Sequence, residues 1–307
     1  DGVIFISIDD GEVSNLKKIC DEVLGASNFV GAIIRKVMEG GKSDSTGLAI
    51  EHEYCLCYGK QGSSGIYKRT SEHLEHYNKK DKYFEERGYY YLKPLENGGL
   101  GYVPTLDYPI AGPNGVDIYP GDFYGDNGYR WVWGKEKFNR ALDLDMIEFT
   151  ISQKDKSKYK VYYKIYEKVD TDGNPSVKTL PFPSLYIDGY TNRQAINDLK
   201  RVFDNIRVFD YPKPLSFLQE LCRMASKDDA IVMDFFSGSA GLAQATMQLN
   251  AEDGGCRKFI MVQLPEVTDE TSEAYKAGYK NICEIGKERI RRAGDKIKDE
   301  AGLTGQG

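Results

Sequence analysis

The residues whose types and spacing most clearly suggest a binding site lie in the stretch 227–250, which reads KDDAIVMDFFSGSAGLAQATMQLN. Its apolar run 230–233 is typical of a strand that is covered on both faces, and Asp234 ends that strand. The residues 237–241 are all small, so a ligand can approach their backbone closely, and a helical apolar pattern follows them. Because free N–H groups at the start of a helix favour polar or anionic groups, this strand, turn and helix predict a cofactor site of the nucleotide type.

Two common nucleotide-binding patterns are absent from this turn. The dinucleotide fingerprint requires G-x-G-x-x-G, which the residues from Gly238 to Gly241 do not supply. The phosphate-binding loop G-x-x-x-x-G-K-[ST] does not occur either. The turn therefore disfavours a nicotinamide-dependent dehydrogenase, and it leaves open other Rossmann-like folds or a purely structural turn.

The string DFFSGSA, Asp234–Ala240, resembles the D-x-F-x-G-S-G loop of S-adenosylmethionine-dependent DNA methyltransferases. In that family the Phe and the Gly of the loop line the pocket for the methionine and adenosine parts of the cofactor. Ala240 stands where the family has its last glycine, and its small side chain should be tolerated. The resemblance thus implies S-adenosylmethionine as the cofactor.

Three further segments, in the order that the family has them, make the resemblance more specific. FDYPKP at 209–214, RKFIMVQLPE at 257–266 and IGKERIRRA at 285–293 resemble segments of beta-class amino-methyltransferases. More narrowly, they resemble the modification subunit of a type III restriction–modification system, and this likeness covers nearly the whole chain. It implies transfer of a methyl group to the exocyclic N6 of adenine in double-stranded DNA. The choice of adenine over cytosine rests on the resemblance alone.

The resemblance also implies partners and a location. A type III modification subunit pairs with itself and with a restriction subunit, so we expect a homodimer that acts on double-stranded DNA in the cytoplasm of a prokaryote, or one encoded by a phage. No apolar run approaches the roughly 20 residues of a membrane span, so no membrane partner is expected. The formal net charge of −6 argues weakly against DNA binding, but a local basic groove matters more than the total.

The cofactor-binding residues implied by the resemblance lie in three segments. They are Lys213, Pro214, Asp234, Phe236, Gly238, Ser239 and Gln263. Gln263 stands where many methyltransferases carry an acid that accepts hydrogen bonds from the ribose hydroxyls. Its amide oxygen can still accept such bonds, although more weakly than a carboxylate.

No catalytic residue is assigned in this chain. The beta-class catalytic loop is Asp-Pro-Pro-Tyr, whose oxygens orient the target amine and whose ring stacks on the flipped base. This sequence contains no Pro-Pro pair, and in the family that loop lies upstream of the strand that matches Val3–Ile8. Since the chain begins at Asp1 and enters this strand at once, we expect a fragment that lacks the loop. The alternative function is a DNA-binding fragment without catalysis.

Five residues are expected to contact DNA or its bases. Tyr54, on a strand that the family places near the target-base pocket, can stack on an extruded base, which is worth roughly 1–3 kcal/mol. Its alternative is a tyrosine packed in the fold. The others, in a region that resembles a target-recognition domain, are Arg130, Trp131, Trp133 and Lys135. For the tryptophans, the alternative is the small core of that region, and for the lysine a solvated helix face.

These observations predict an α/β protein with a Rossmann-like S-adenosylmethionine-dependent methyltransferase sheet and an inserted α+β target-recognition domain. The expected domains are 1–60, the catalytic-side half truncated at its N-terminus, 61–195, the insertion, and 196–307, the cofactor-binding half. No metal site is expected, because His73 and His76 have no third ligand at suitable spacing. The arginines of the last helix, Arg289, Arg291 and Arg292, are expected to be solvated.

Overall fold

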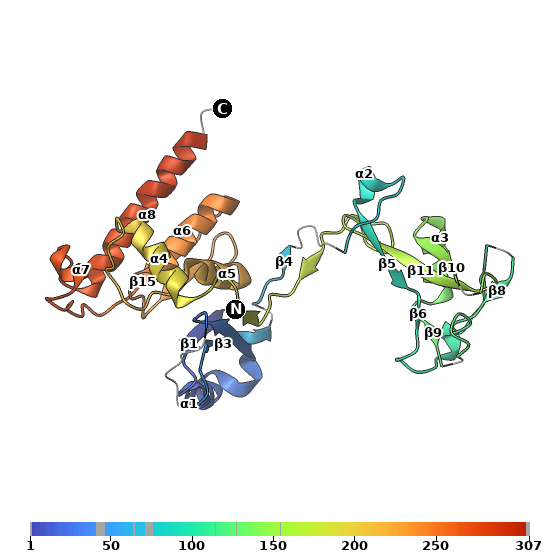
Figure 1. Ribbon diagram of the computed structural model, residues 1–307, viewed down its shortest axis with the longest axis horizontal. Helices are drawn as coiled ribbons and strands as arrows, with labels where there is room; N and C mark the ends of the chain where they lie inside the picture. Colours follow the sequence, from blue (N-terminus) through green and yellow to red (C-terminus); the bar gives the residue numbers. More distant parts are fainter. Residues whose placement is uncertain are drawn as a thin grey trace. The chain divides into compact units, whose positions relative to one another are not determined.

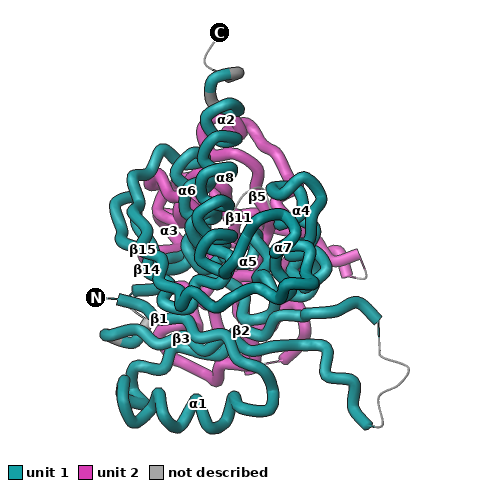
Figure 2. The backbone as a smooth tube through the Cα atoms, turned by 90° about the vertical axis from the view of Figure 1, so that its left-hand side faces the viewer, with its two compact units in different colours: residues 1–69, 181–307 teal, residues 70–180 magenta. Residues whose placement is uncertain are grey.

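The structure of the chain is a computed structural model that describes residues 2–40, 47–63, 65–70, 76–113, 115–126, 128–153 and 155–304. It divides into two compact units (Figure 2). Unit 1 is Asp1–Arg69 with Pro181–Gly307, and unit 2 is Thr70–Leu180. The sequence-based boundaries at residues 60 and 195 differ from these. Strand β3 continues to Ser63, and Tyr186 pairs with a strand of unit 1.

Unit 1 contains a four-stranded sheet in the order β1 (Val3–Ile8), β3 (His52–Ser63), β2 (Phe29–Lys36) and β13 (Leu185–Tyr186). The first three strands are antiparallel, whereas β13 is parallel to β2. Successive residues of β3 face opposite sides of this sheet, as the strand geometry requires. The short strand β13 thus joins the chain that returns from unit 2 to the sheet formed by the first sixty residues.

Both faces of this sheet are covered. On one face, Leu56 packs with Cys20 at the end of helix α1 (Val13–Cys20). On the other face, Cys55 packs with Phe217 of helix α5 (Leu215–Ala225). The helix α5 therefore connects the sheet to the second half of unit 1. The chain between α1 and β2 forms the short helices η1 (Asp21–Gly25) and η2 (Ala26–Asn28).

The second half of unit 1 is built around two parallel strands, β14 (Ile231–Asp234) and β15 (Lys258–Met261), which pair from Ile231 opposite Lys258 to Asp234 opposite Met261. Helix α6 (Gly241–Asp253) connects them, and it contacts β15 and the helices α5 and α8 (Figure 1). The remaining helices are α4 (Asn192–Val202), α7 (Glu273–Lys276) and α8 (Ile282–Thr304). The predicted order of strand, turn, helix and strand is thus present.

One face of this parallel pair is open to solvent. The side chains of Ile231 and Met233 are 67% and 55% exposed, and Ile260 on β15 is 46% exposed. The sequence-based expectation of a strand covered on both faces is therefore wrong for β14 among the described residues. An apolar run identifies a parallel strand, but it does not identify what lies over each face.

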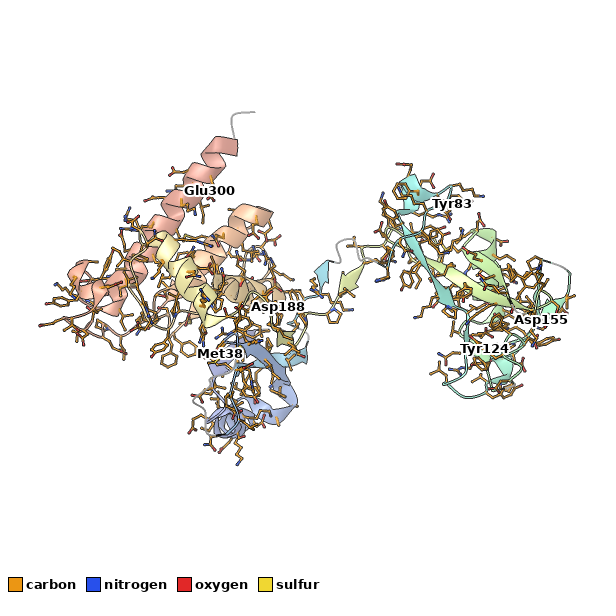
Figure 3. The ribbon with its side chains drawn as sticks, in the orientation of Figure 1. Met38, Tyr83, Tyr124, Asp155, Asp188 and Glu300 are labelled. Carbon is orange, nitrogen blue, oxygen red and sulfur yellow. The ribbon has the colours of Figure 1, made fainter. Side chains whose placement is uncertain are left out.

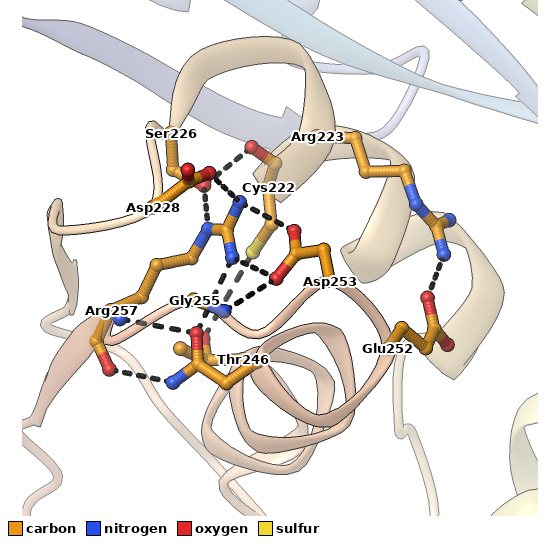
Figure 4. Close-up of polar contacts among 10 residues, drawn as sticks. Cys222, Arg223, Ser226, Asp228, Thr246, Glu252, Asp253, Gly255 and Arg257 are labelled. Carbon is orange, nitrogen blue, oxygen red and sulfur yellow. Dashed lines mark hydrogen bonds and ion pairs between the residues drawn. The ribbon is translucent and has the colours of Figure 1, made fainter.

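Arg257 anchors the C-terminal end of helix α6 (Figure 4). Its guanidinium donates to Asp253 at 2.9 Å and to Ser226 Oγ at 3.0 Å, and it lies 3.5 Å from Asp228. Its backbone N–H donates to Asn250 at 3.1 Å. This arginine ties the end of α6, the start of β15 and the segment before β14 together.

Unit 2 has a three-stranded antiparallel sheet in the order β10 (Ile147–Ile151), β11 (Tyr159–Tyr166) and β5 (Tyr90–Pro94). The helix α3 (Lys135–Asp143) lies between β5 and β10 in the chain. Its shorter elements are α2 (Phe84–Arg87), β6 (Glu96–Asn97), η3 (Pro104–Leu106), β7 (Ile110–Ala111), β8 (Asp117–Ile118) and β9 (Arg130–Trp131). Strands β4 (Arg69–Thr70) and β12 (Thr179–Leu180) pair where the chain enters and leaves unit 2.

The fold is mixed α/β with several sheets, which confirms the predicted class. Within the described residues of unit 1, however, the strands form a four-stranded sheet and a separate parallel pair. A search of the helices in the described ranges finds none that is both long enough and apolar enough to span a bilayer.

Candidate functional site

The turn between β14 and α6 contains two residues with a left-handed backbone. Gly238 has a φ of 49°, and Ala240 has a φ of 56° and a ψ of 39°, so both are left-handed. A Cβ atom on Gly238 would lie 3.2 Å from the ring of Phe209, which would force one of them to move. The N–H of Ala240 donates to Ser237 O at 2.7 Å and closes the turn. The chain thus enters α6 abruptly, with the first N–H groups of the helix beside the turn.

Asp234 shapes the start of this turn. Its Oδ1 atom accepts a hydrogen bond from the backbone N–H of Phe236 at 3.0 Å. Burial raises the pKa of this carboxyl group, and the hydrogen bond from Phe236 opposes that rise. In this structure Asp234 therefore stabilises the turn through this hydrogen bond, and a direct contact with a ligand stays a prediction.

Phe236 projects from the turn. Its side chain is 84% exposed, and Phe235 beside it is 50% exposed. A large apolar side chain that is this exposed in a turn of small residues is available to cover a flat ring such as an adenine. A role of Phe236 in cofactor binding stays a prediction.

Gln263, just beyond β15, reaches back to the turn. Its Oε1 atom accepts a hydrogen bond from the N–H of Gly238 at 2.7 Å. The side chain therefore holds the ends of β14 and β15 together. The comparison of Gln263 with a ribose-binding acid in the sequence did not predict this contact. An oxygen has two lone pairs, so a bond to a ribose hydroxyl stays a prediction.

Lys213 is paired within the fold. Its Nζ atom lies 2.6 Å from Oε2 of Glu53 on β3, and Arg35 on β2 donates to the same oxygen at 2.9 Å. Burial opposes the ionisation of Glu53, but these two cations outweigh it and lower the pKa of Glu53. The next residue, Pro214, is the N-cap of α5. Sequence reasoning missed Glu53, whose only signal was an acid just before the apolar part of a strand.

Tyr54 lies on β3, next to Glu53 in the chain. Its hydroxyl group donates to Asp10 at 3.3 Å and lies 3.0 Å from His52 Nε2. Its side chain is partly exposed. The structure thus leaves both the base-stacking prediction and the packed alternative open for Tyr54.

Trp131 belongs to the core of unit 2. It is completely buried, and its Nε1–H donates to the carbonyl oxygen of Tyr108 at 2.8 Å. A ring without exposed surface cannot touch DNA in this conformation, so the expected contact by Trp131 is corrected to its core alternative. Tyr108 in turn donates its hydroxyl proton to the carbonyl oxygen of Trp133 at 2.9 Å.

The other three residues predicted to contact DNA in unit 2 retain some exposure. Trp133 is partly buried, with its ring centroid 4.1 Å from that of Tyr163. Lys135 is exposed at the start of α3. Arg130 is partly buried, and its Nε atom has no hydrogen-bond partner among the described residues. Contacts with DNA stay predictions for all three.

Sequence reasoning missed an aromatic and cationic group on unit 2. The rings of Tyr124 and Tyr129 stack with centroids 4.7 Å apart. Tyr124, which is labelled in Figure 3, is 46% exposed. Lys160 Nζ lies 4.7 Å from the ring centroid of Tyr124 and forms a hydrogen bond with its hydroxyl group. The abundance of tyrosine and lysine in this region was the only sequence signal, and it did not say which of them meet.

A metal centre is not found in the described ranges, where no group of three or more His, Cys, Asp or Glu side chains could hold an ion. His73 lies outside the described residues.

The comparisons with known proteins decide the family. The family model for N6 and N4 DNA methylases, described as DNA methylase, matches residues 1–292. The chain belongs to the DNA methylase family. The EcoPI Mod subunit of a type III restriction–modification enzyme, from Escherichia phage P1, is 31% identical over 95% of this chain and 46% of its own length. The type II methyltransferase M.KpnI of Klebsiella pneumoniae is 31% identical over 97% of this chain and 70% of its own length.

A solved DNA modification protein of Thermus thermophilus, in complex with S-adenosyl-L-methionine, aligns over 95% of this chain and 70% of its own. Its sequence identity of 13% and TM-score of 0.38 are too low to support a fold or a ligand. The predicted likeness to amino-methyltransferases is confirmed at the level of the family. The chain spans about half the length of the phage P1 relative that it matches.

Proposed function

We propose that this DNA methylase chain binds S-adenosylmethionine at the turn between β14 and α6 and takes part in methylating DNA. The observation that carries the proposal is the turn itself, with left-handed residues at Gly238 and Ala240 and the exposed ring of Phe236. Such a turn at the carboxyl end of a parallel strand is where α/β folds bind nucleotide-type cofactors. Membership of the DNA methylase family supports the choice of cofactor.

The residues of the turn suit the methionine part and the adenine of this cofactor. The small turn 237–241 admits a close approach of the methionine part, whose carboxylate suits the positive end of α6. Phe236 offers an apolar face to the adenine. When bound, the cofactor supplies an electrophilic methyl group on its sulfonium sulfur. The chain's own part is to hold that group in one orientation, which Asp234 and Gln263 support through their hydrogen bonds to the N–H groups of Phe236 and Gly238.

The acceptor that we propose is the exocyclic N6 of adenine in double-stranded DNA. The nitrogen would form a bond to the methyl carbon and lose a proton, while the electron pair of the broken carbon–sulfur bond stays on sulfur. The likeness to the EcoPI Mod subunit supports a type III system, with a second copy and a restriction subunit as partners in the cytoplasm. Unit 2 would contact DNA through Arg130, Trp133 and Lys135, and Tyr54 would face the target base.

A calorimetric titration of the chain with S-adenosylmethionine, with NAD as the control ligand, tests the cofactor site. We expect S-adenosylmethionine alone to bind. Binding of NAD, or of neither ligand, would contradict the proposal for this chain. Transfer of a labelled methyl group to duplex DNA then separates catalysis from the alternative of DNA binding without catalysis. That alternative is favoured by one observation, the lack of an Asp-Pro-Pro-Tyr loop in residues 1–307.

A further inference from the structure

Arg289 lies directly behind the turn. This residue of α8 is 1% exposed, so the expectation that it is solvated is wrong. Its Nη1 atom donates to Ser239 Oγ at 3.0 Å and approaches Ser239 O at 3.5 Å. Its Nε atom donates to Gln244 Oε1 at 2.7 Å, in the first turn of α6. One side chain thus holds both the turn and the start of the helix that follows it.

Helix α8 packs in van der Waals contact with the turn. A Cβ atom on Gly286, three residues before Arg289, would lie 3.4 Å from the Cβ of Ala240 and 3.5 Å from the carbonyl oxygen of Gly238. A Cβ atom on Gly241 would lie 3.2 Å from Arg289 Nη1 and 2.9 Å from Leu218. The guanidinium is therefore in direct contact with the backbone that would receive the ligand.

The charge of Arg289 has no partner of opposite sign in contact with it. Among the described residues, no carboxylate is close enough to Arg289 to form an ion pair, and Asp198 acts on its charge only at longer range. The Nη2 atom of Arg289 has no hydrogen-bond partner in the described ranges. Burial lowers the pKa of Arg289 to about 10, against the field of Asp198, so the side chain stays protonated at neutral pH. A buried charge without a carboxylate in direct contact is costly, and the positive end of the α6 dipole lies beside it.

Arg257 provides an internal comparison. It is also almost buried and also contacts α6, but Asp253 lies 2.9 Å from its guanidinium and Asp228 lies 3.5 Å away (Figure 4). The chain thus places carboxylates against one buried arginine of this half of unit 1 and leaves the other, behind the turn, without them.

We propose that Arg289 is a positioning residue that makes the turn selective for a ligand with a carboxylate group. It fixes Ser239 and places a positive charge beneath the N-terminus of α6, and the carboxylate of the ligand adds a negative charge on the turn side, where no carboxylate of the described residues contacts Arg289. The inference rests on the proposed function, in which that carboxylate belongs to the methionine part of S-adenosylmethionine. Arg289 itself touches the turn and not the ligand.

The experiment compares two ligands that differ only in the carboxylate, S-adenosylhomocysteine and its decarboxylated form, by calorimetry with the full chain. For Arg289→Met, which removes the charge and keeps the length, we expect the affinity for S-adenosylhomocysteine to fall about tenfold. The affinity for the decarboxylated form should change less than about twofold. Arg289→Lys, which keeps the charge, should retain the preference for the carboxylate. If Arg289→Met does not fold, two other measurements test the inference. They are the preference of Arg289→Lys and the salt dependence of the preference in the unchanged chain.

Three results would overturn the inference. The first is an equal loss of affinity for both ligands in Arg289→Met, which would mean that Arg289 only shapes the turn. The second is an unchanged preference for the ligand with the carboxylate in Arg289→Met. The third is the loss of that preference in Arg289→Lys. The matched control is Arg257→Met, which should lower the melting temperature and leave the preference unchanged. If the unchanged chain binds neither ligand, the proposed cofactor site fails first, so the two failures are distinguishable.

Discussion

The Nζ atom of Lys213 lies 2.6 Å from Oε2 of Glu53, a residue 160 positions earlier in the chain. The same carboxylate accepts from Arg35, whose other nitrogen donates to the carbonyl oxygen of Tyr190 at 2.6 Å. Glu53 therefore joins the segment before α5 to the sheet, and Arg35 joins both to the chain that returns from unit 2. Lys213 is thereby held by the fold before any ligand arrives.

This relationship predicts a pH-dependent stability. The pKa of Glu53 is lowered in the folded chain, so its contribution is fully present above the ordinary glutamate pKa and is lost as the pH falls through the lowered value. At pH 7 we expect Glu53→Gln to lower the free energy of unfolding by about 1–3 kcal/mol, because two cations then face each other. Thermal melting from pH 7 to pH 3 should show this difference shrinking.

The control for this prediction is Glu22→Gln, which neutralises an exposed acid of the same unit. It should change stability by less than about 0.5 kcal/mol at any pH in that range. If the difference in stability between Glu53→Gln and the unchanged chain stays constant down to pH 3, the ion pair is not the cause of that difference.

Phe236→Ala should separate ligand binding from folding. Since the ring is 84% exposed, its removal should change stability by less than about 0.5 kcal/mol. If the ring covers the adenine, the affinity for S-adenosylmethionine should fall about tenfold in calorimetry. Phe217→Ala, at a site that is 1% exposed, is the contrasting variant and should cost about 3–5 kcal/mol. An unaltered affinity in Phe236→Ala would remove this ring from the site.

Trp131→Ala should act on stability. The buried indole ring packs with Tyr108 and Phe138, so its loss should cost unit 2 about 3–5 kcal/mol, measured by denaturant unfolding. Lys135→Ala, at an exposed position, should leave stability unchanged, weaken DNA binding and reduce the salt slope by about 1 if it contacts a phosphate. The core assignment of Trp131 fails if its variant melts normally and binds DNA less tightly.

Ala240→Gly should stabilise the chain. An alanine in the left-handed region, here with φ of 56°, carries a steric cost that glycine lacks. We expect a gain of about 0.5–1 kcal/mol in the free energy of unfolding, from the midpoint of a urea titration. Ala243→Gly, in the buried interior of α6, should instead destabilise by about 1 kcal/mol or more. Equal effects of the two substitutions would show that the backbone conformation of residue 240 is not the reason.

The local parts of the site could be predicted from the sequence, because they depend on neighbouring residues. The apolar run before Asp234, the small residues of the turn and the helix after it appear as β14, the turn and α6. The contacts that hold the turn could not be predicted, because they join distant segments. Gln263 reaches Gly238 across 25 positions, and Arg289 reaches Ser239 across 50.

Residue type alone also left some positions undecided. Arg289, Arg291 and Arg292 lie within four residues of one another on α8, yet only the first is buried, and helical geometry decides which of them faces α6. By residue type, Trp131 and Trp133 fit either the core of the insertion or a binding surface. Their burial depends on partners such as Tyr108 and Tyr163, which are not adjacent in sequence.

The open face of the β14–β15 pair has a consequence for handling the isolated chain. Ile231, Met233 and Ile260 present an apolar strip to solvent, and the chain has a calculated isoelectric point of about 5.4. Repulsion between molecules vanishes near that pH, and exposed apolar surface then promotes association. Colloidal solubility should therefore be lowest near pH 5.4 and should improve at neutral or higher pH, where the net charge of −6 opposes contact between copies.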